Sequence, residues 1–280
     1  MAKDSAIEWT HHTFNPWWGC VKVSPGCKHC YAETWARRVG QAVWGAGAQR
    51  RFFTDAHWKE PLAWHKALRP GQRQRVFCAS MADVFEDRRD LDASRERLWR
   101  LIADTPQLDW LLLTKRPQNV ARLAPYGNAW PHNIWLGATA ENQRWFDRRI
   151  DELGELPAKV RFLSCEPLLG PIDLSSAARR GRRLVDWIIA GGESGPHARP
   201  PSPEWFTSLR DQCLEAGIKF HFKQWGNWKP VKPHQVNGYA SKTLFLSSGD
   251  KIIVVNMGKK KTGRRLDGAE WNQFPRSAKA

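Results

Sequence analysis

Three cysteines near the N-terminus, Cys20, Cys27 and Cys30, follow the spacing C-x6-C-x2-C. Thiolates this close along a chain can hold a soft metal centre. Structural zinc sites usually fill all four metal positions with protein side chains, and iron–sulfur clusters normally use four cysteines. Three cysteines leave one position open, so a cluster bound here would offer one iron to a small ligand.

A histidine could instead complete this site as a structural one. His11 and His12 precede the cysteines, and His29 stands between two of them. None of the three has a distinctive ligand spacing, and His29 would point elsewhere if both of its cysteine neighbours ligate. Zinc held by three cysteines and a histidine is therefore the alternative to an open iron–sulfur centre.

The chain is strongly basic. Its 280 residues include 44 Lys and Arg against 28 Asp and Glu, which gives a net charge of +16. This surplus favours polyanionic partners, and DNA or RNA first. Indoles in a Gly/Asn loop could stack on bases, and a basic run near the C-terminus either contacts nucleic acid or only solvates the tail. The candidates are Trp225, Trp228, Lys259, Lys260, Arg264 and Arg265.

Membrane-spanning and secreted proteins fit the sequence poorly. No apolar run is long enough to span a membrane, and the N-terminal residues lack the apolar core of a signal peptide. We expect a cytoplasmic protein with no membrane partner. In that compartment the six cysteines suit metal binding or catalysis better than a disulfide framework. The sequence leaves open whether a separately encoded partner protein is required.

Strand-like and helical segments alternate along most of the chain. The nearly continuous apolar strands indicate a parallel sheet covered on both faces, and about seven β/α units predict a TIM-like or partial (β/α) barrel. The expected strands are Glu8–Asn15, Arg75–Ser80, Asp109–Thr114, Asn133–Thr139, Lys159–Cys165, Asp186–Ala190 and Ile218–Gln224. The expected helices are Tyr31–Val43, Asp90–Asp104, Pro117–Leu123, Glu141–Leu153 and Ser202–Ala216.

The pattern changes after Gln224. Thr243–Leu246 and Lys251–Val255 flank the turn sequence Ser-Ser-Gly-Asp and predict a β-hairpin. We therefore expect a barrel-like domain over residues 1–225 and, over residues 226–280, a small C-terminal appendage with the hairpin and the basic run.

Polar side chains stand where the expected strands end, which is where parallel α/β proteins place their active sites. We expect these strand ends and the cysteine loop to share one site. Groups suited to a zwitterionic ligand and to the hydroxyls of a ribose are Ser80, Asp83, Thr139, Glu141, Gly191, Gly192 and Glu193. Lys115, Glu166 and Cys165 are the catalytic candidates. In the alternative interpretation the acids and lysines neutralise one another, and Cys165 is a packed small apolar residue.

Several segments resemble a phage and bacterial family of three-cysteine proteins of unknown function. They are Asn15–Cys20, Ser24–Glu33, Leu112–Pro117, Leu163–Leu168, Ala190–Gly195 and Gly263–Gly268. That family is similar to radical SAM enzymes, with spore photoproduct lyase-type proteins as distant relatives. The resemblance implies a partial TIM barrel in which Cys20, Cys27 and Cys30 bind a [4Fe-4S] cluster. It further implies that the open iron binds S-adenosylmethionine, whose cleavage gives a radical that abstracts hydrogen from the substrate.

The sequence departs from the radical SAM pattern in two places. The commonest spacing there is C-x3-C-x2-C, and this chain has three more residues between its first two cysteines. A Gly-Gly-Glu motif often follows the second strand in those enzymes, whereas Gly191–Glu193 follows a much later strand here.

Three functions follow from these observations. The first is an iron–sulfur enzyme of radical SAM type that modifies or repairs nucleic acid or a nucleotide. The second is a [4Fe-4S] redox or photochemical DNA repair factor that does not use S-adenosylmethionine. The third is a zinc-stapled protein that binds nucleic acid without catalysis.

Overall fold

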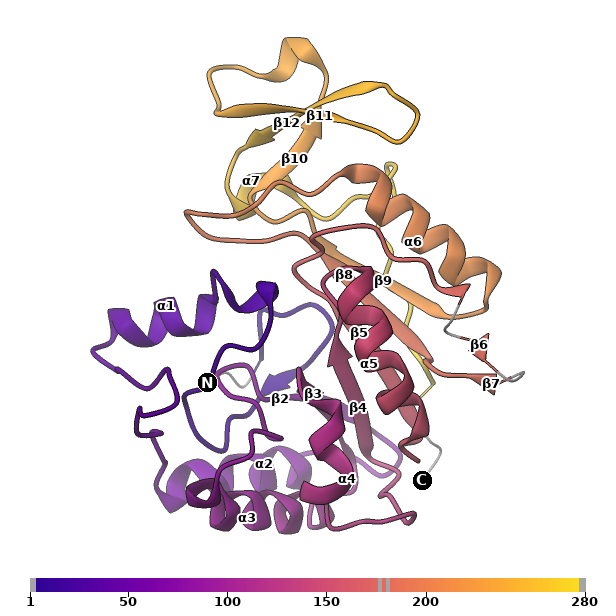
Figure 1. Ribbon diagram of the computed structural model, residues 1–280. Coiled ribbons are helices and arrows are strands. Elements are labelled where there is room, and N and C mark those ends of the chain that lie inside the picture. The colour runs from indigo at the N-terminus through magenta and orange to yellow at the C-terminus, as the bar shows by residue number, and fades with distance from the viewer. Residues whose placement is uncertain (1–3, 176–177, 180–181, 277–280) are drawn as a thin grey trace. The chain divides into compact units, whose positions relative to one another are not determined.

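The protein is a mixed α/β chain, described here from a computed structural model over residues 4–175, 178–179 and 182–276 (Figure 1). The chain divides into two compact units. Unit 1 contains Met1–Ala138, Arg149–Phe162 and Pro275–Ala280. Unit 2 contains Thr139–Arg148 and Leu163–Phe274. Each unit is described by itself.

Unit 1 consists of parallel strands with helices between them. The strands are β1 His12–Thr13, β2 Gln74–Cys78, β3 Leu108–Thr114 and most of β4 Ile134–Thr139. The helices are α1 Tyr31–Arg38, α2 Asp55–Lys66, α3 Asp92–Ala103 and α4 Val120–Leu123. Strand β2 pairs in parallel with β1 and β3, and β3 pairs in parallel with β4.

Aromatic side chains form much of the core of unit 1. The ring of Phe14 stacks on His57 with 4.6 Å between centroids and meets Trp110 edge-on. His57 comes from α2, and its Nε2 lies 3.0 Å from the carbonyl oxygen of Asn15. Helix α2 is thereby fixed against the segment that leads from β1 into the cysteines.

Unit 2 contains the remaining strands of the large sheet and a separate antiparallel sheet. Its elements include β8 Trp187–Gly191, α6 Pro203–Glu215 and β9 Lys219–Gln224, with α6 packed against both strands. Unit 2 also contains the short strands β6 Ala178–Arg179 and β7 Arg182–Arg183. Helix α5 Gln143–Glu155 and strand β5 Val160–Cys165 contribute residues to both units. Helix α6, expected over Ser202–Ala216, has Ser202 as its N-cap residue and begins at Pro203, where a proline has no N–H to lose in the first turn.

The C-terminal part of unit 2 forms a three-stranded antiparallel sheet in the order β10-β12-β11. Its elements are β10 Trp228–Val231, β11 Ser241–Phe245 and β12 Lys251–Asn256, followed by the short helix α7 Lys259–Thr262. The expected hairpin is confirmed as β11 and β12. Strand β10 was not predicted, because Pro230 interrupts its apolar alternation and the pairing with β12 is long-range.

In the described part of the chain, seven strands form one sheet in the order β1-β2-β3-β4-β5-β8-β9. The mixed α/β class and the parallel sheet are confirmed. Since β1 and β9 are the ends of this order, a closed eight-stranded barrel is not confirmed. No helix among the described residues is long and apolar enough to cross a membrane.

Two expectations about the N-terminal elements were wrong in detail. The first strand is the two-residue β1 rather than Glu8–Asn15, because only this part pairs with β2. Helix α2 was not predicted, since Pro61 lies inside it and normally ends a helix. Packing of Trp58 and Trp64, both buried, holds the helix despite the proline.

Candidate functional site

The three cysteines lie in one segment of unit 1 and differ from the other thiols in exposure. Cys20 follows β1, Cys27 ends a 3-10 turn, and Cys30 caps the N-terminus of α1. All three are partly exposed, whereas Cys78, Cys165 and Cys213 are buried. These are the thiols that a ligand arriving from solvent can reach.

Contacts to the residues after β2 hold the cysteine segment in place. The amide of Gly19 donates to the carbonyl of Met81 at 3.0 Å. Asn15 Oδ1 accepts the Met81 amide at 2.7 Å, and its Nδ2 donates to Ser80 Oγ at 3.0 Å. The Tyr31 hydroxyl donates to the carbonyl of Ser80 at 3.0 Å. Both ends of the segment are therefore tied to the carboxyl end of β2.

Gly19 also meets a steric requirement at the start of the segment. Its φ is +115°, and a Cβ there would lie 2.3 Å from the carbonyl oxygen of Val43. Only glycine avoids both problems.

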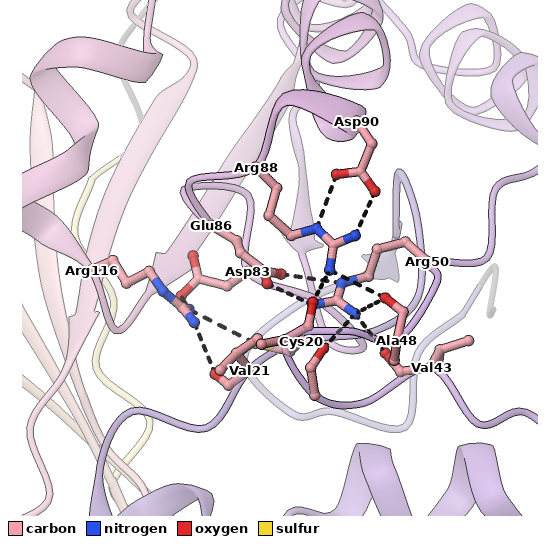
Figure 2. A network of polar contacts seen from close by, with 12 residues as sticks. Cys20, Val21, Val43, Ala48, Arg50, Asp83, Glu86, Arg88, Asp90 and Arg116 are labelled. Atoms are coloured by element: carbon pink, nitrogen blue, oxygen red, sulfur yellow. Dashed lines mark hydrogen bonds and ion pairs between the residues drawn. The ribbon is translucent and has the colours of Figure 1, made fainter.

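Arg116, at the end of β3, contacts the first cysteine (Figure 2). Its Nη1 donates to Cys20 Sγ at 3.8 Å and to Asp83 Oδ2 at 2.7 Å, and its Nη2 donates to the carbonyl of Val21 at 2.8 Å. Asp83 also accepts the Thr114 hydroxyl at 2.7 Å. Burial, and then the charge of Asp83, raise the pKa of the Cys20 thiol to about 12, while Arg116 opposes the shift.

A second network, also drawn in Figure 2, fixes the chain that follows α1. Arg50 and Glu86 form a buried ion pair at 2.6 Å. Arg50 Nη1 donates to the carbonyls of Val43, Gly45 and Ala48. A buried guanidinium that uses its donors on main-chain oxygens has a structural role, because it leaves few donors for a ligand.

Cys30 directly precedes the first turn of α1 as its N-cap residue. The main-chain amides of Glu33 and Ala32 lower the pKa of this thiol, and the positive charge of Lys115 acts in the same direction. Burial is the larger effect and raises that pKa. Cys27 Sγ lies 3.8 Å from Ser24 Oγ.

The donor set fits a thiolate-bound cluster by its chemistry. Three partly exposed thiols share one segment, a guanidinium donates to one sulfur, and main-chain amides and Lys115 favour the thiolate form of another, which suits ligands that carry negative charge. Among the described residues, no group of three His, Cys, Asp or Glu side chains is placed closely enough to hold a metal ion. The fit is therefore one of donor type and surroundings.

The two histidines before the cysteines have partners within the strand region. His11 Nδ1 accepts the amide of Arg75 at 2.9 Å, and His12 Nε2 lies 2.8 Å from Gln74 Oε1. His12 also stacks on Trp64 with 4.4 Å between ring centroids. Both rings are held along β1 and β2, which disfavours them as fourth ligands.

Of the cofactor-binding candidates in unit 1, Ser80 and Asp83 support the cysteine segment. Ser80 holds Asn15 and Tyr31, as described above, and Asp83 holds Arg116. The carboxylate of Asp83 also accepts the amide of Lys115 at 3.1 Å. These contacts place Lys115, the catalytic candidate of unit 1, at the end of β3 on the same side as the cysteines.

Unit 2 brings together another set of predicted residues at the ends of β5, β8 and β9. Lys223 Nζ lies 3.0 Å from Glu166 Oε1, and the Ser164 hydroxyl donates to Glu166 Oε2 at 3.3 Å. A Cβ on Gly191 would lie 2.9 Å from Glu166 Oε1. Glycine at this position leaves room for the carboxylate, and the ion pair is the neutralisation that the alternative interpretation predicted.

The Gly192–Glu193 pair shapes the chain around β9. A Cβ on Gly192 would lie 1.9 Å from the carbonyl oxygen of Trp225. Glu193 accepts the Arg199 amide at 2.8 Å and forms an ion pair with its guanidinium at 2.5 Å. The close approach of the Trp225 carbonyl to Gly192 and the pairing of Glu193 with Arg199 give both residues a structural role here.

The remaining strand-end candidates of unit 2 are buried. Thr139, Glu141 and Cys165 have no exposed surface. Burial raises the pKa of the Cys165 thiol well above its ordinary value, with Cys213 as the next contribution. Its burial agrees with the alternative interpretation, in which Cys165 is a packed small apolar residue.

The two tryptophans expected to stack on bases are in the core. Trp225 is 4% exposed and donates its indole N–H to the carbonyl of Arg265. Trp228 is 7% exposed and donates to the carbonyl of Ala198. Their ring faces are covered, whereas the basic candidates Lys259, Lys260 and Arg265 are exposed and Arg264 is half-buried.

A family model described as protein of unknown function (DUF5131) matches residues 4–275. The chain belongs to this family. No curated protein and no solved structure matches the chain. The matched range of this DUF5131 protein contains the three cysteines and every strand-end residue discussed above.

The sequence reasoning missed Asn15 and Arg116 as parts of the site. Both stand in segments that had been singled out, Asn15 before Trp17 and Arg116 in the run Thr114–Pro117. The sequence offered one signal for them, because Asn15 is a polar residue close to the cysteine segment and Arg116 is a polar residue at a strand end. It could not say that Arg116 contacts Cys20 or that the Asn15 side chain contacts the residues after β2.

Proposed function

We propose that Cys20, Cys27 and Cys30 hold a [4Fe-4S] cluster and that this DUF5131 protein is an iron–sulfur enzyme of radical SAM type. The observation that carries the proposal is the surrounding of the thiols: Arg116 donates to the sulfur of Cys20, and the amides of α1 and the charge of Lys115 favour the thiolate form of Cys30. Hydrogen bonds of this kind stabilise thiolate ligands and tune a cluster.

Three cysteine ligands leave one iron for S-adenosylmethionine, and the cluster would supply the electron for its cleavage. The chain's own residues would position the cysteine ligands and set the charge around them. Asn15, Gly19 and Tyr31 hold the segment against the end of β2, and Arg116 places positive charge beside Cys20. The positive charge of Lys115 lowers the pKa of the Cys30 thiol.

The proposed substrate is a nucleic acid or a nucleotide, whose modification or repair would use hydrogen abstraction. The net charge of +16 supports an anionic partner. A cluster protein that acts in redox or photochemical repair without S-adenosylmethionine is distinguished from this function by the spectroscopy below.

The test is anaerobic iron–sulfur reconstitution followed by metal analysis and low-temperature EPR with and without S-adenosylmethionine. We expect a reduced [4Fe-4S] signal that changes when S-adenosylmethionine is added. Replacing Cys20, Cys27 or Cys30 with Ala should abolish the signal, whereas Cys213→Ala, at a buried thiol in α6, should retain it.

Each other outcome overturns part of the proposal. A cluster signal that ignores S-adenosylmethionine would favour the redox or photochemical factor. Stoichiometric zinc without iron would favour the zinc-stapled binding protein. A Cys20→Ala variant with full cluster content would show that the ligand assignment is wrong.

A further inference from the structure

The three-stranded sheet β10-β12-β11 has one face turned into unit 2 and one face with exposed side chains. Leu244, Val254 and Trp228 pack together with Ala198 on the inner face. Strand residues alternate between faces, and directly opposed residues of antiparallel strands share a face. Phe245 opposes Lys251, and Thr243 opposes Ile253, so these four residues lie on the outer face.

The register of β10 extends the outer face. Lys229 opposes Val255, and Val231 opposes Ile253. Val255 is buried, so the exposed part of this face is the end that carries Thr243, Phe245 and Lys251. The face therefore carries one aromatic ring, two lysines and short aliphatic or hydroxyl side chains, with Lys251 Nζ 5.6 Å from the ring centroid of Phe245. We call this set the outer sheet face: Lys229, Val231, Thr243, Phe245, Lys251 and Ile253.

Phe245 contacts Lys251 and is otherwise strongly exposed to solvent. It is 68% exposed, the highest value among the described large apolar side chains that are exposed. A single exposed apolar residue needs no explanation. An exposed ring in the middle of a dense positive charge is a different case, because the two features together match the surfaces that bind unpaired bases.

The charge around the sheet is concentrated. Residues 226–265 contain nine Lys and Arg and a single acid, Asp250, which gives +8 out of the +16 of the whole chain. Asp250 accepts a hydrogen bond from Ser248 at 2.8 Å. Lys232, Lys242, Lys251 and Lys260 are exposed. Half of the excess charge thus lies in forty residues.

We propose that the outer sheet face binds single-stranded nucleic acid, with Phe245 stacking on a base and the lysines contacting phosphates. The inference rests on the nucleic-acid part of the proposed function and supplies a surface for it in place of the buried Trp225 and Trp228. A duplex keeps its bases stacked on one another, whereas a single strand presents base faces to an exposed ring.

The experiment measures fluorescence anisotropy of labelled single strands of about 12 nucleotides, of DNA and of RNA, with the full chain before any reconstitution. The same length of duplex is the competing probe. The variants are Phe245→Leu and the pair Lys229→Gln with Lys251→Gln. Their matched controls are Phe52→Leu, at an exposed phenylalanine of unit 1, and the pair Lys59→Gln with Lys66→Gln in α2.

We expect Phe245→Leu to raise the Kd for the single strand at least about fivefold, because base–aromatic stacking is lost. The pair of lysine substitutions should lower the slope of log K against log salt by about 0.7 for each lysine. Both control variants should bind like the unchanged protein.

Equal affinities of Phe245→Leu and Phe52→Leu would overturn the proposal, and so would a duplex that binds as tightly as the single strand. The outcome is separate from that of the cluster. Binding that depends on Phe245 in a protein without a cluster would retain the surface and reject the radical enzyme. If the cluster responds to S-adenosylmethionine but Phe245→Leu binds the single strand as tightly as the unchanged protein, the radical enzyme is retained and the binding surface is rejected.

Discussion

The guanidinium of Arg116 donates a hydrogen bond to the sulfur of Cys20 across 3.8 Å, although 96 residues separate the two along the chain. The same guanidinium contacts Asp83 and the carbonyl of Val21. One side chain thus joins the end of β3, the residues after β2 and the first cysteine. The cysteine segment of unit 1 depends on this junction for its position.

Replacing Arg116 with Lys should weaken the junction, because an ammonium cannot reach the three partners that the planar guanidinium joins. We expect the unfolding free energy of the apoprotein to fall by about 2 kcal/mol, since Asp83 loses much of its buried pairing. Urea denaturation measures this loss, and iron analysis after reconstitution should show a reduced cluster content.

Arg122→Lys is the control for this substitution. Arg122 pairs with Asp87 at 2.5 Å, but both side chains are more than half exposed. Exposed pairs contribute little to stability, so the denaturation midpoint should not move. Equal effects at Arg116 and Arg122 would contradict the structural role given to Arg116.

Gly19→Ala should destabilise unit 1 and reduce cluster binding. A Cβ at this position would lie 2.3 Å from the Val43 carbonyl oxygen and 2.7 Å from Arg50 Cδ, at a φ of +115°. Gly45→Ala is the matched control, because Gly45 has the same φ and no atom within 4 Å of an added Cβ. A positive φ alone costs about 1–3 kcal/mol.

The difference between the two glycine variants isolates the steric effect. We expect Gly19→Ala to lose clearly more unfolding free energy in urea than Gly45→Ala, and to take up less iron. If the two variants behave alike, the close approach of Gly19 to Val43 does not determine the position of the cysteine segment.

Most strands could be predicted from the sequence because buried parallel strands are nearly continuous in apolar residues. Strand β3, with Leu111 and Leu112 fully buried, shows this directly. The cysteines stood out by residue type and spacing, and their partial exposure agrees with that choice. Short-range patterns of this kind can be read from neighbouring residues alone.

The long-range contacts could not be predicted in the same way. The indoles of Trp225 and Trp228 looked exposed among glycines and asparagines, but distant carbonyls of Arg265 and Ala198 accept their N–H groups. Helix α2 is stable because Trp58 and Trp64 are buried, a property that its sequence with an internal proline conceals. In each case a partner far along the chain decides the outcome.

Tyr126 should make stability depend on pH in the alkaline range. Burial raises the pKa of its phenol to about 12, and its oxygen has no hydrogen-bond partner among the described residues. In the unfolded chain a tyrosine ionises near pH 10. The folded state therefore holds this proton more tightly, and the associated stability is present below pH 10 and lost as the pH rises toward 12.

The measurement is a tyrosinate absorbance titration of the protein and of Tyr126→Phe, with urea denaturation at several alkaline pH values. The difference between the two titrations should show a transition close to pH 12. Tyr126→Phe should also lose less stability than the unchanged protein between pH 10 and 12. A difference titration centred near pH 10 would contradict the assigned burial.

The Glu166–Lys223 pair of unit 2 should be energetically coupled. The two groups lie 3.0 Å apart, and their side chains are only 13% and 18% exposed. Each single substitution, Glu166→Gln or Lys223→Met, leaves a largely buried charge without its partner and should destabilise the protein. The double variant removes both charges, so its loss should be smaller than the sum of the two single losses.

A double-mutant cycle in urea measures this coupling, and we expect about 1–2 kcal/mol. Arg210 and Asp267 supply the comparison, because Asp267 is 59% exposed and water screens that pair. Additive effects at Glu166 and Lys223 would mean that the pair does not neutralise itself in the folded protein. The lysine and the carboxylate would then be free to act on a ligand separately, which is the catalytic role first considered for Glu166.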